Sequence, residues 1–247
     1  MSVLVTVDGA IGTLTLDRPE AYNAINIGLA QALERGLRTL GHDPAVKVIV
    51  IRGAGGNFSV GGDFKELDRL RGEGVDAVRE LFESFHRACE AIASLPVPVL
   101  AAVEGHACAG GFELALASDI VLVRDDAKLS DIHSNHGMVP GGGSTQRLPR
   151  LVGSQRALGL ILSGDRLSGS EAVQWGLAYR AFAEGEFESG VTEFAAKLAA
   201  KDRAALQRSK RLVRDGLERP LADGIALELE TVLEHLSGSA TFAMGAG

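Results

Sequence analysis

The chain has 247 residues, enough for one large domain or two small ones, and its hydrophobic content of 46% is that of an ordinary globular protein rather than a disordered chain. Its net charge of −7 argues against general nucleic-acid binding, which needs a basic surface. No apolar run reaches the roughly 18 residues of a membrane span, and the sequence shows no signal-peptide pattern, so we expect a cytoplasmic protein whose two cysteines, Cys89 and Cys108, stay reduced.

The first half of the chain alternates short apolar runs with segments of helical periodicity. The apolar runs predict five strands, at residues 3–7, 11–16, 46–51, 99–103 and 120–123. Apolar spacing of three and four residues predicts helices that begin after Asn26 and at Phe64, Val75 and Phe112. Asn26 is expected to cap the first helix, and the stretches 53–62 and 104–111 are expected to be loops. Such alternation is typical of an α/β fold.

The second half is mostly helical. We predict helices at residues 148–162, 168–176, 187–200, 203–217 and 221–236, and one further strand within 177–182. The tail, 238–247, is glycine-rich and is expected to be loose. The sequence therefore predicts an α/β core over residues 1–185 and a helical C-terminal region over 186–247.

Two glycine-rich loops of the predicted core each lead into a helix. The first, residues 57–65, fits either a backbone amide aimed at a ligand oxygen, that of Gly62, or a tight turn capped by Asp63. In the second, Gly110 and Gly111 precede Glu113 at the start of an apolar helix. A helix N-terminus offers unpaired N–H groups, and glycine lets a ligand approach the backbone, although a glutamate in a first turn is also ordinary dipole compensation.

Residues 131–144 contain a second group of polar side chains. Asp131, His133 and His136 favour acid–base chemistry, because histidine titrates near neutral pH. We expect no metal here, since no third ligand follows at zinc spacing. The glycines that follow do not make a phosphate-binding loop, because Gly143 stands where such a loop has lysine.

Taken together, the two glycine loops supply backbone donors from two strand-to-helix junctions with a carboxylate beside the second. This combination is suited to stabilising the enolate of a thioester. The whole pattern resembles the enoyl-CoA hydratase/isomerase (crotonase) family over residues 3–236. The matching segments are residues 16–24, 58–65, 105–119, 140–153, 162–164 and 172–177.

The resemblance implies a spiral of repeated ββα units with a helical C-terminal region that packs trimers, often paired into hexamers. It also implies an enzyme that binds an acyl-CoA thioester and needs no cofactor beyond the coenzyme A of its substrate. The two oxyanion-hole amides map to Gly62 and Gly110, and the first catalytic glutamate maps to Glu113. The CoA contacts map to the backbone at Ala24 and Val60 near the adenine, and to the side chains of Arg18 and Lys65 near the phosphates.

The chain departs from the family pattern at the second catalytic glutamate. That position falls on His133, with Asp131 two residues earlier. Three accounts follow. His133 replaces the glutamate, with Asp131 beside it, and the enzyme adds or removes water as an enoyl-CoA hydratase. Alternatively, Glu113 alone shuttles a proton, or His133 activates water against a carbonyl, giving an isomerase or an acyl-CoA or C–C bond hydrolase. In the third account catalysis is lost and the protein only binds acyl-CoA or a partner.

Overall fold

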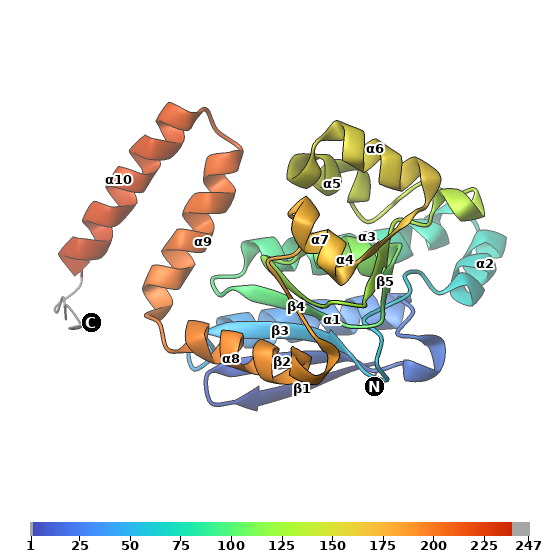
Figure 1. Ribbon diagram of the computed structural model, residues 1–247, viewed down its shortest axis with the longest axis horizontal. Coiled ribbons are helices and arrows are strands. Elements are labelled where there is room, and N and C mark those ends of the chain that lie inside the picture. Colours follow the sequence, from blue (N-terminus) through green and yellow to red (C-terminus); the bar gives the residue numbers. More distant parts are fainter. Residues whose placement is uncertain (1, 239–247) are drawn as a thin grey trace.

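A computed structural model of the chain describes residues 2–238 (Figure 1). The predicted loose tail therefore lies outside the described residues, apart from Gly238, which ends the last helix.

The core is a six-stranded sheet with the order β1-β2-β3-β4-β6-β9. Its first pair is antiparallel and all later neighbours are parallel. The strands are β1 (Val3–Asp8), β2 (Ile11–Leu16), β3 (Val48–Gly53), β4 (Val99–Val103), β6 (Ile120–Arg124) and β9 (Arg180–Phe182). Because parallel neighbours end at the same edge, the loops that follow β3 and β4 lie side by side.

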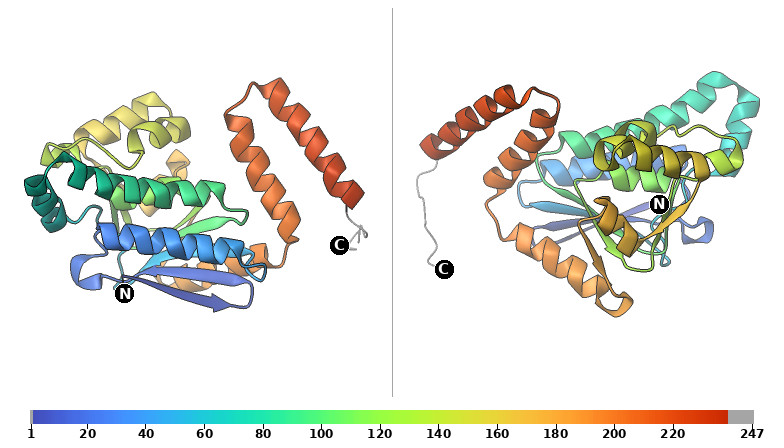
Figure 2. Two further views of the ribbon diagram at one scale, coloured as in Figure 1. Left: turned by 180° about the vertical axis from the view of Figure 1, so that it is seen from behind. Right: turned by 45° about the horizontal axis from the view of Figure 1, so that its top comes forward.

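Helices cover both faces of this sheet, as a mainly parallel sheet requires. Helices α1 (Ile27–His42) and α3 (Val75–Ser94) pack on one face, where Ile49 and Ile51 of β3 point. Helix α8 (Phe187–Ala199) packs on the other face, where Val48 and Val50 point and meet Phe187. Figure 2 shows these layers from two sides. Successive side chains of β3 point to opposite faces, and both faces are covered by helices. The strand sequence is therefore a continuous apolar run.

A second, three-stranded sheet has the order β5-β7-β8. It consists of β5 (His106–Cys108), β7 (Lys128–Ser130) and β8 (Arg166–Ser168). The expected loop at 104–111 therefore contains a strand. Runs of three residues are too short to show periodicity in the sequence, so none of these strands was predicted.

The core also contains shorter helices. They are α2 (Phe64–Glu73), α4 (Gly110–Ala117), α5 (Ser144–Val152), α6 (Ser154–Ser163) and α7 (Gly169–Trp175), with 3-10 turns at Pro19–Ala21, Ser134–His136 and Glu184–Glu186. The prediction of a single helix at 148–162 was wrong, because the helix is interrupted at Gly153, whose φ of +80° suits glycine. The Asn26 cap is confirmed, since its side chain accepts a hydrogen bond from Leu29 N at 2.8 Å.

The chain ends in an antiparallel pair of helices, α9 (Arg203–Leu217) and α10 (Leu221–Gly238), that projects from the core (Figures 1 and 2). Helix α9 is held to the core by Lys210, whose ammonium lies 2.7 Å from Asp119 and also donates to two backbone carbonyls of the core. Arg214 donates to the same carboxylate at 2.6 Å. The predicted domain boundary at 185/186 stays a prediction: α8 lies on the sheet, whereas α9 and α10 extend beyond it.

Among residues 2–238, no helix is both long and apolar enough to cross a membrane. The cytoplasmic location stays an expectation.

Candidate active site

The two predicted glycine turns meet. Gly61 has a φ of +99°, and a Cβ added there would lie 2.9 Å from Gly110 N and 2.7 Å from the Ala109 Cβ. A Cβ added at Gly110 would lie 3.6 Å from Gly62 N. The backbone around Gly62 therefore lies directly against the N-terminus of α4, and a larger residue at position 61 would force the two turns apart.

The local backbone leaves both amides available. Within residues 2–238, neither the Gly62 N–H nor the Gly110 N–H donates to a protein acceptor. Ala109 holds the start of α4 with φ +46° and ψ −119°, a strained conformation for a residue with a Cβ, and its own amide donates to Ser130 O at 3.0 Å. Two donors from separate turns are thus presented to one region of space.

Glu113 lies one turn inside α4 and is 2% exposed. Its Oε1 accepts hydrogen bonds from Gly142 N at 2.7 Å and from Ser144 N at 3.0 Å. Burial raises the pKa of Glu113 above its usual value, although these two donors and the nearby His133 favour the ionised form. The other oxygen, Oε2, lies 3.9 Å from His133 Nε2.

His133 is fixed by Asp131. The imidazole Nδ1 lies 2.6 Å from Asp131 Oδ1, so Nε2 points toward Glu113. Burial lowers the pKa of His133, but the hydrogen bond and charge of Asp131, together with the charge of Glu113, outweigh it and raise the pKa above 6.5. Burial likewise opposes ionisation of Asp131, yet its hydrogen bonds with His133 and Ser144 lower its pKa overall.

Ser144 contacts both Glu113 and Asp131, and the sequence did not predict this role. Its backbone N–H binds Glu113, and its hydroxyl donates to Asp131 Oδ2. Ser144 is fully buried, as is Asp131. The sequence signal was its place directly after the glycines that end at Gly143, but its contact with Asp131 depends on folding.

The four central groups open into one pocket. Gly62, Gly110, Glu113 and His133 line one pocket that opens to solvent. Its remaining walls are apolar or aromatic: Ile25, Val60, Phe64, Leu67, Leu81, Phe82, Phe85, Ala109, Ile132, His136 and Met138. The pocket thus combines an apolar wall with two backbone donors and an acid–base pair, which is the composition of a small-molecule site.

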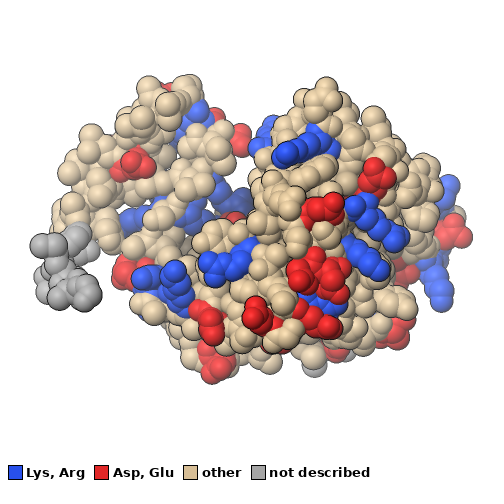
Figure 3. Space-filling model, in the orientation of Figure 1, with Lys and Arg blue, Asp and Glu red and all other residues tan. Residues whose placement is uncertain are grey.

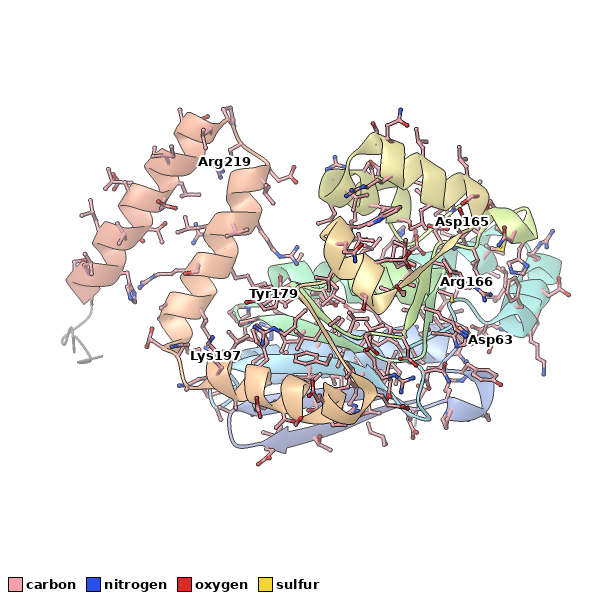
Figure 4. The ribbon with its side chains drawn as sticks, viewed as in Figure 1. Asp63, Asp165, Arg166, Tyr179, Lys197 and Arg219 are labelled. Carbon is pink, nitrogen blue, oxygen red and sulfur yellow. The ribbon has the colours of Figure 1, made fainter. Side chains whose placement is uncertain are left out.

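The four predicted CoA contacts differ in their surroundings, and Ala24 and Lys65 adjoin the pocket-lining residues Ile25 and Phe64. Val60 lines the pocket. Lys65 is exposed in the first turn of α2. Arg18 instead donates to Ala24 O at 2.6 Å and to Asp63, labelled in Figure 4, at 2.8 Å. Asp63 also caps α2, so Arg18 fastens its own turn to the start of that helix, and its contact with a phosphate stays a prediction.

Comparison with known proteins identifies the family. The family model described as "Enoyl-CoA hydratase/isomerase" matches residues 6–246. The chain belongs to the enoyl-CoA hydratase/isomerase family.

A member from Rhizobium meliloti (strain 1021), named "Probable enoyl-CoA hydratase", is 35% identical over 92% of this chain and 86% of its own. A crystal structure of an enoyl-CoA hydratase from Polaromonas sp. JS666 superposes with a TM-score of 0.92 at 30% identity, covering 96% of this chain and 92% of that one. A Thermobifida fusca YX structure in complex with acetoacetyl-CoA has a TM-score of 0.87 at 31% identity and covers 96% of both chains. These similarities confirm the predicted crotonase-like α/β fold with a helical C-terminal region.

We predict that the His133 imidazole titrates above pH 6.5 in the folded protein, and that Asp131→Asn lowers its midpoint by about 1–3 pH units by removing the adjacent charge. The contacts that raise this pKa stabilise the folded chain below pH 6.5, and their contribution is lost as the pH rises through the folded value. Histidine NMR titration measures the midpoint. A midpoint at or below 6.5, or one unmoved by Asp131→Asn, would contradict this electrostatic account.

Proposed function

We propose that this protein is an enoyl-CoA hydratase, which adds water reversibly across the double bond of a 2-enoyl-CoA thioester. The observation that carries the proposal is the pairing of Glu113 and His133, 3.9 Å apart, beside the Gly62 and Gly110 amides in one pocket. Relatives named enoyl-CoA hydratase, and a related structure in complex with acetoacetyl-CoA, support it.

The Gly62 and Gly110 amides receive the thioester carbonyl oxygen in this proposal. As water adds at Cβ, electrons move toward that oxygen, and the thioester becomes an enolate. Two aligned N–H donors stabilise this charge more than the neutral carbonyl, so they lower the barrier. Gly110 begins α4, so the partial positive charge of a helix N-terminus adds to the effect.

Glu113 and His133 then carry the two protons. In the hydration direction the Glu113 carboxylate takes a proton from water as the oxygen bonds to Cβ, and the His133 imidazolium gives its Nε2 proton to Cα. Dehydration reverses both transfers, with protonated Glu113 as acid and neutral His133 as base. A water at ordinary hydrogen-bond distance can contact both Glu113 Oε2 and His133 Nε2, since those atoms are 3.9 Å apart.

Replacing the family's second carboxylate by histidine keeps the number of transferable protons. A carboxylate–imidazolium pair holds one proton, as a pair of carboxylates sharing a proton does, but it carries one more positive charge. Asp131 balances that charge through its 2.6 Å contact with His133 Nδ1. Because the reaction moves only protons and one water molecule, we propose that it uses no cofactor besides the coenzyme A of the substrate.

Thioester hydrolysis is the second candidate, and the Asp131–His133 contact favours it specifically. An imidazole oriented by a buried carboxylate is the arrangement of a general base that activates water. The same two amides would then stabilise the tetrahedral oxyanion. The two activities differ in product, because hydrolysis releases free CoA thiol whereas hydration does not.

We expect the purified protein to remove the conjugated-thioester absorbance of crotonyl-CoA without releasing thiol. Glu113→Gln and His133→Gln should each lower kcat by about 10²–10⁴-fold with little change in CoA affinity, because general acid–base catalysis contributes about that much. The hydration rate should fall on the alkaline side as His133 loses its proton, and His133→Glu should abolish that fall.

Thiol release in place of hydration would favour the hydrolase. Absence of any turnover, repeated in His133→Glu, would contradict an enzymatic role. Full activity of Glu113→Gln would contradict its assigned part.

We also propose that the chain assembles as a trimer or as a pair of trimers. The α9–α10 hairpin carries large apolar side chains that are exposed in the single chain, a feature typical of interaction surfaces. They are Val213, Leu217, Leu221, Ile225, Leu229, Val232, Leu233 and Leu236. Light scattering after size-exclusion chromatography should give three or six times 25.8 kDa, and a monomer would contradict the assembly.

A further inference from the structure

The peptide bond between Gly141 and Gly142 lies between the buried active site and an exposed side chain of α3. On the inner side, its N–H, from Gly142, donates to Glu113 Oε1 at 2.7 Å. On the outer side, its carbonyl, from Gly141, accepts a hydrogen bond from His86 Nε2 at 2.5 Å. A single planar peptide unit therefore lies between an exposed histidine and the catalytic carboxylate.

Helix α3 fixes this peptide with three neighbouring side chains. A Cβ added at Gly141 would lie 2.3 Å from the Phe82 ring, and one added at Gly142 would lie 2.3 Å from the Phe85 ring. The two rings thus fill the space beside the turn, and His86 binds its carbonyl. Phe82, Phe85 and His86 are spaced to share one helix face.

His86 does not line the pocket that holds Glu113. It lines a separate groove between the core and the α9–α10 hairpin. Figure 3 shows the notch beside that hairpin, with Lys and Arg side chains along it. The charged residues that share the groove with His86 are Glu90 of α3, Arg147 and Arg150 of α5, and Arg214, Glu218 and Arg219, which lie on or just after α9.

We propose that His86 is a positioning residue for Glu113, acting through the Gly141–Gly142 peptide. A donor on the carbonyl draws electron density from the amide, so the N–H on the other side of the same peptide becomes a stronger donor. The contact also holds the turn at the distance where Gly142 N reaches Glu113. Both the neutral Nε2–H tautomer and the imidazolium donate from Nε2, so the role does not require His86 to change protonation.

Arg147 holds the next carbonyl of the same turn. Its Nη1 donates to Gly142 O at 2.7 Å. That carbonyl belongs to the following peptide unit, so Arg147 fixes the turn without polarising the N–H that Glu113 receives. His86 is the side chain whose hydrogen bond lies on the same peptide unit as that N–H.

The effect of His86 on rate rests on the proposed hydratase function, but its effect on Glu113 can be measured without turnover. The test compares His86→Phe, which keeps a ring but loses the donor, with His86→Gln, whose amide nitrogen can replace Nε2. His42→Phe is the matched control, because His42 is also exposed and also contacts a backbone carbonyl, that of Arg38 at 2.7 Å. His86→Ala serves in place of His86→Phe if that variant does not fold.

The readout is the titration of the Glu113 carboxyl by ¹³C NMR of glutamate-labelled protein, assigned with Glu113→Gln. The titratable groups that interact with Glu113 include His133, Asp131 and Cys89, and none of them is altered in these variants. Loss of the hydrogen bond to Gly141 O weakens the Gly142 donor without removing it, so the Glu113 midpoint should rise by about a few tenths of a pH unit in His86→Phe. His86→Gln should restore most of the shift, and His42→Phe should leave the midpoint unchanged.

A Glu113 midpoint unmoved in His86→Phe, or in His86→Ala where that variant replaces it, would overturn the proposal, as would an equal shift in His42→Phe. If the protein hydrates enoyl-CoA, kcat should fall several-fold in His86→Phe with KM little changed, and the acid limb of the rate profile should move up with the midpoint. If the wild-type protein hydrates nothing, the hydratase function fails while the NMR titration still decides the role of His86.

Discussion

The close contact of two backbone turns, at Gly61–Gly62 and Ala109–Gly110, is the constraint on which the site depends. It follows from sheet order, because β3 and β4 are parallel neighbours and the loops after them leave from one edge. The backbone of Ser59 then pairs with β5, through hydrogen bonds of 2.9 Å to His106 O and from Cys108 N. Only glycine fits at position 61, so the turns pack closely and the Gly62 and Gly110 amides face one region of the pocket.

The buried charges of the site follow from this contact. Helix α4 begins at the meeting of the turns, so Glu113 is carried into the interior, where an isolated carboxylate would be costly. Backbone donors from Gly142 and Ser144 offset that cost. The Ser144 hydroxyl positions Asp131 by a hydrogen bond, and Asp131 positions His133 in the same way. Each ionisable group is therefore paired, and the one pair left open to the pocket is Glu113 with His133.

The sequence predicted the long elements well for a physical reason. Buried strands such as β4 and amphipathic helices such as α1 and α3 carry their periodicity in neighbouring residues. The three-residue strands β5, β7 and β8 form only because distant segments supply their partners, so their sequences carried no such signal. Gly153 ended a helix by its positive φ, although the apolar spacing continued across it.

The residues of the site likewise fall into those that the sequence could predict and those that it could not. The glycine loops, Glu113 and the Asp131–His133 pair could be named from the sequence, because each is local and because the family resemblance aligned them. The hydroxyl of Ser144 and the imidazole of His86 act on residues 13 and 55 positions away, and nothing in the sequence indicates those contacts. Arg18, predicted to lie near the phosphates, is paired with Asp63 in the structure, and its contact with a phosphate stays a prediction.

The most direct test of the account is a crystal structure of this protein with bound acetoacetyl-CoA. The account predicts that the thioester oxygen lies at hydrogen-bond distance, about 2.7–3.2 Å, from both Gly62 N and Gly110 N, with Glu113 and His133 beside the acyl carbons. A thioester oxygen bound by other groups, or an acyl chain outside the pocket that Glu113 and His133 share, would contradict it.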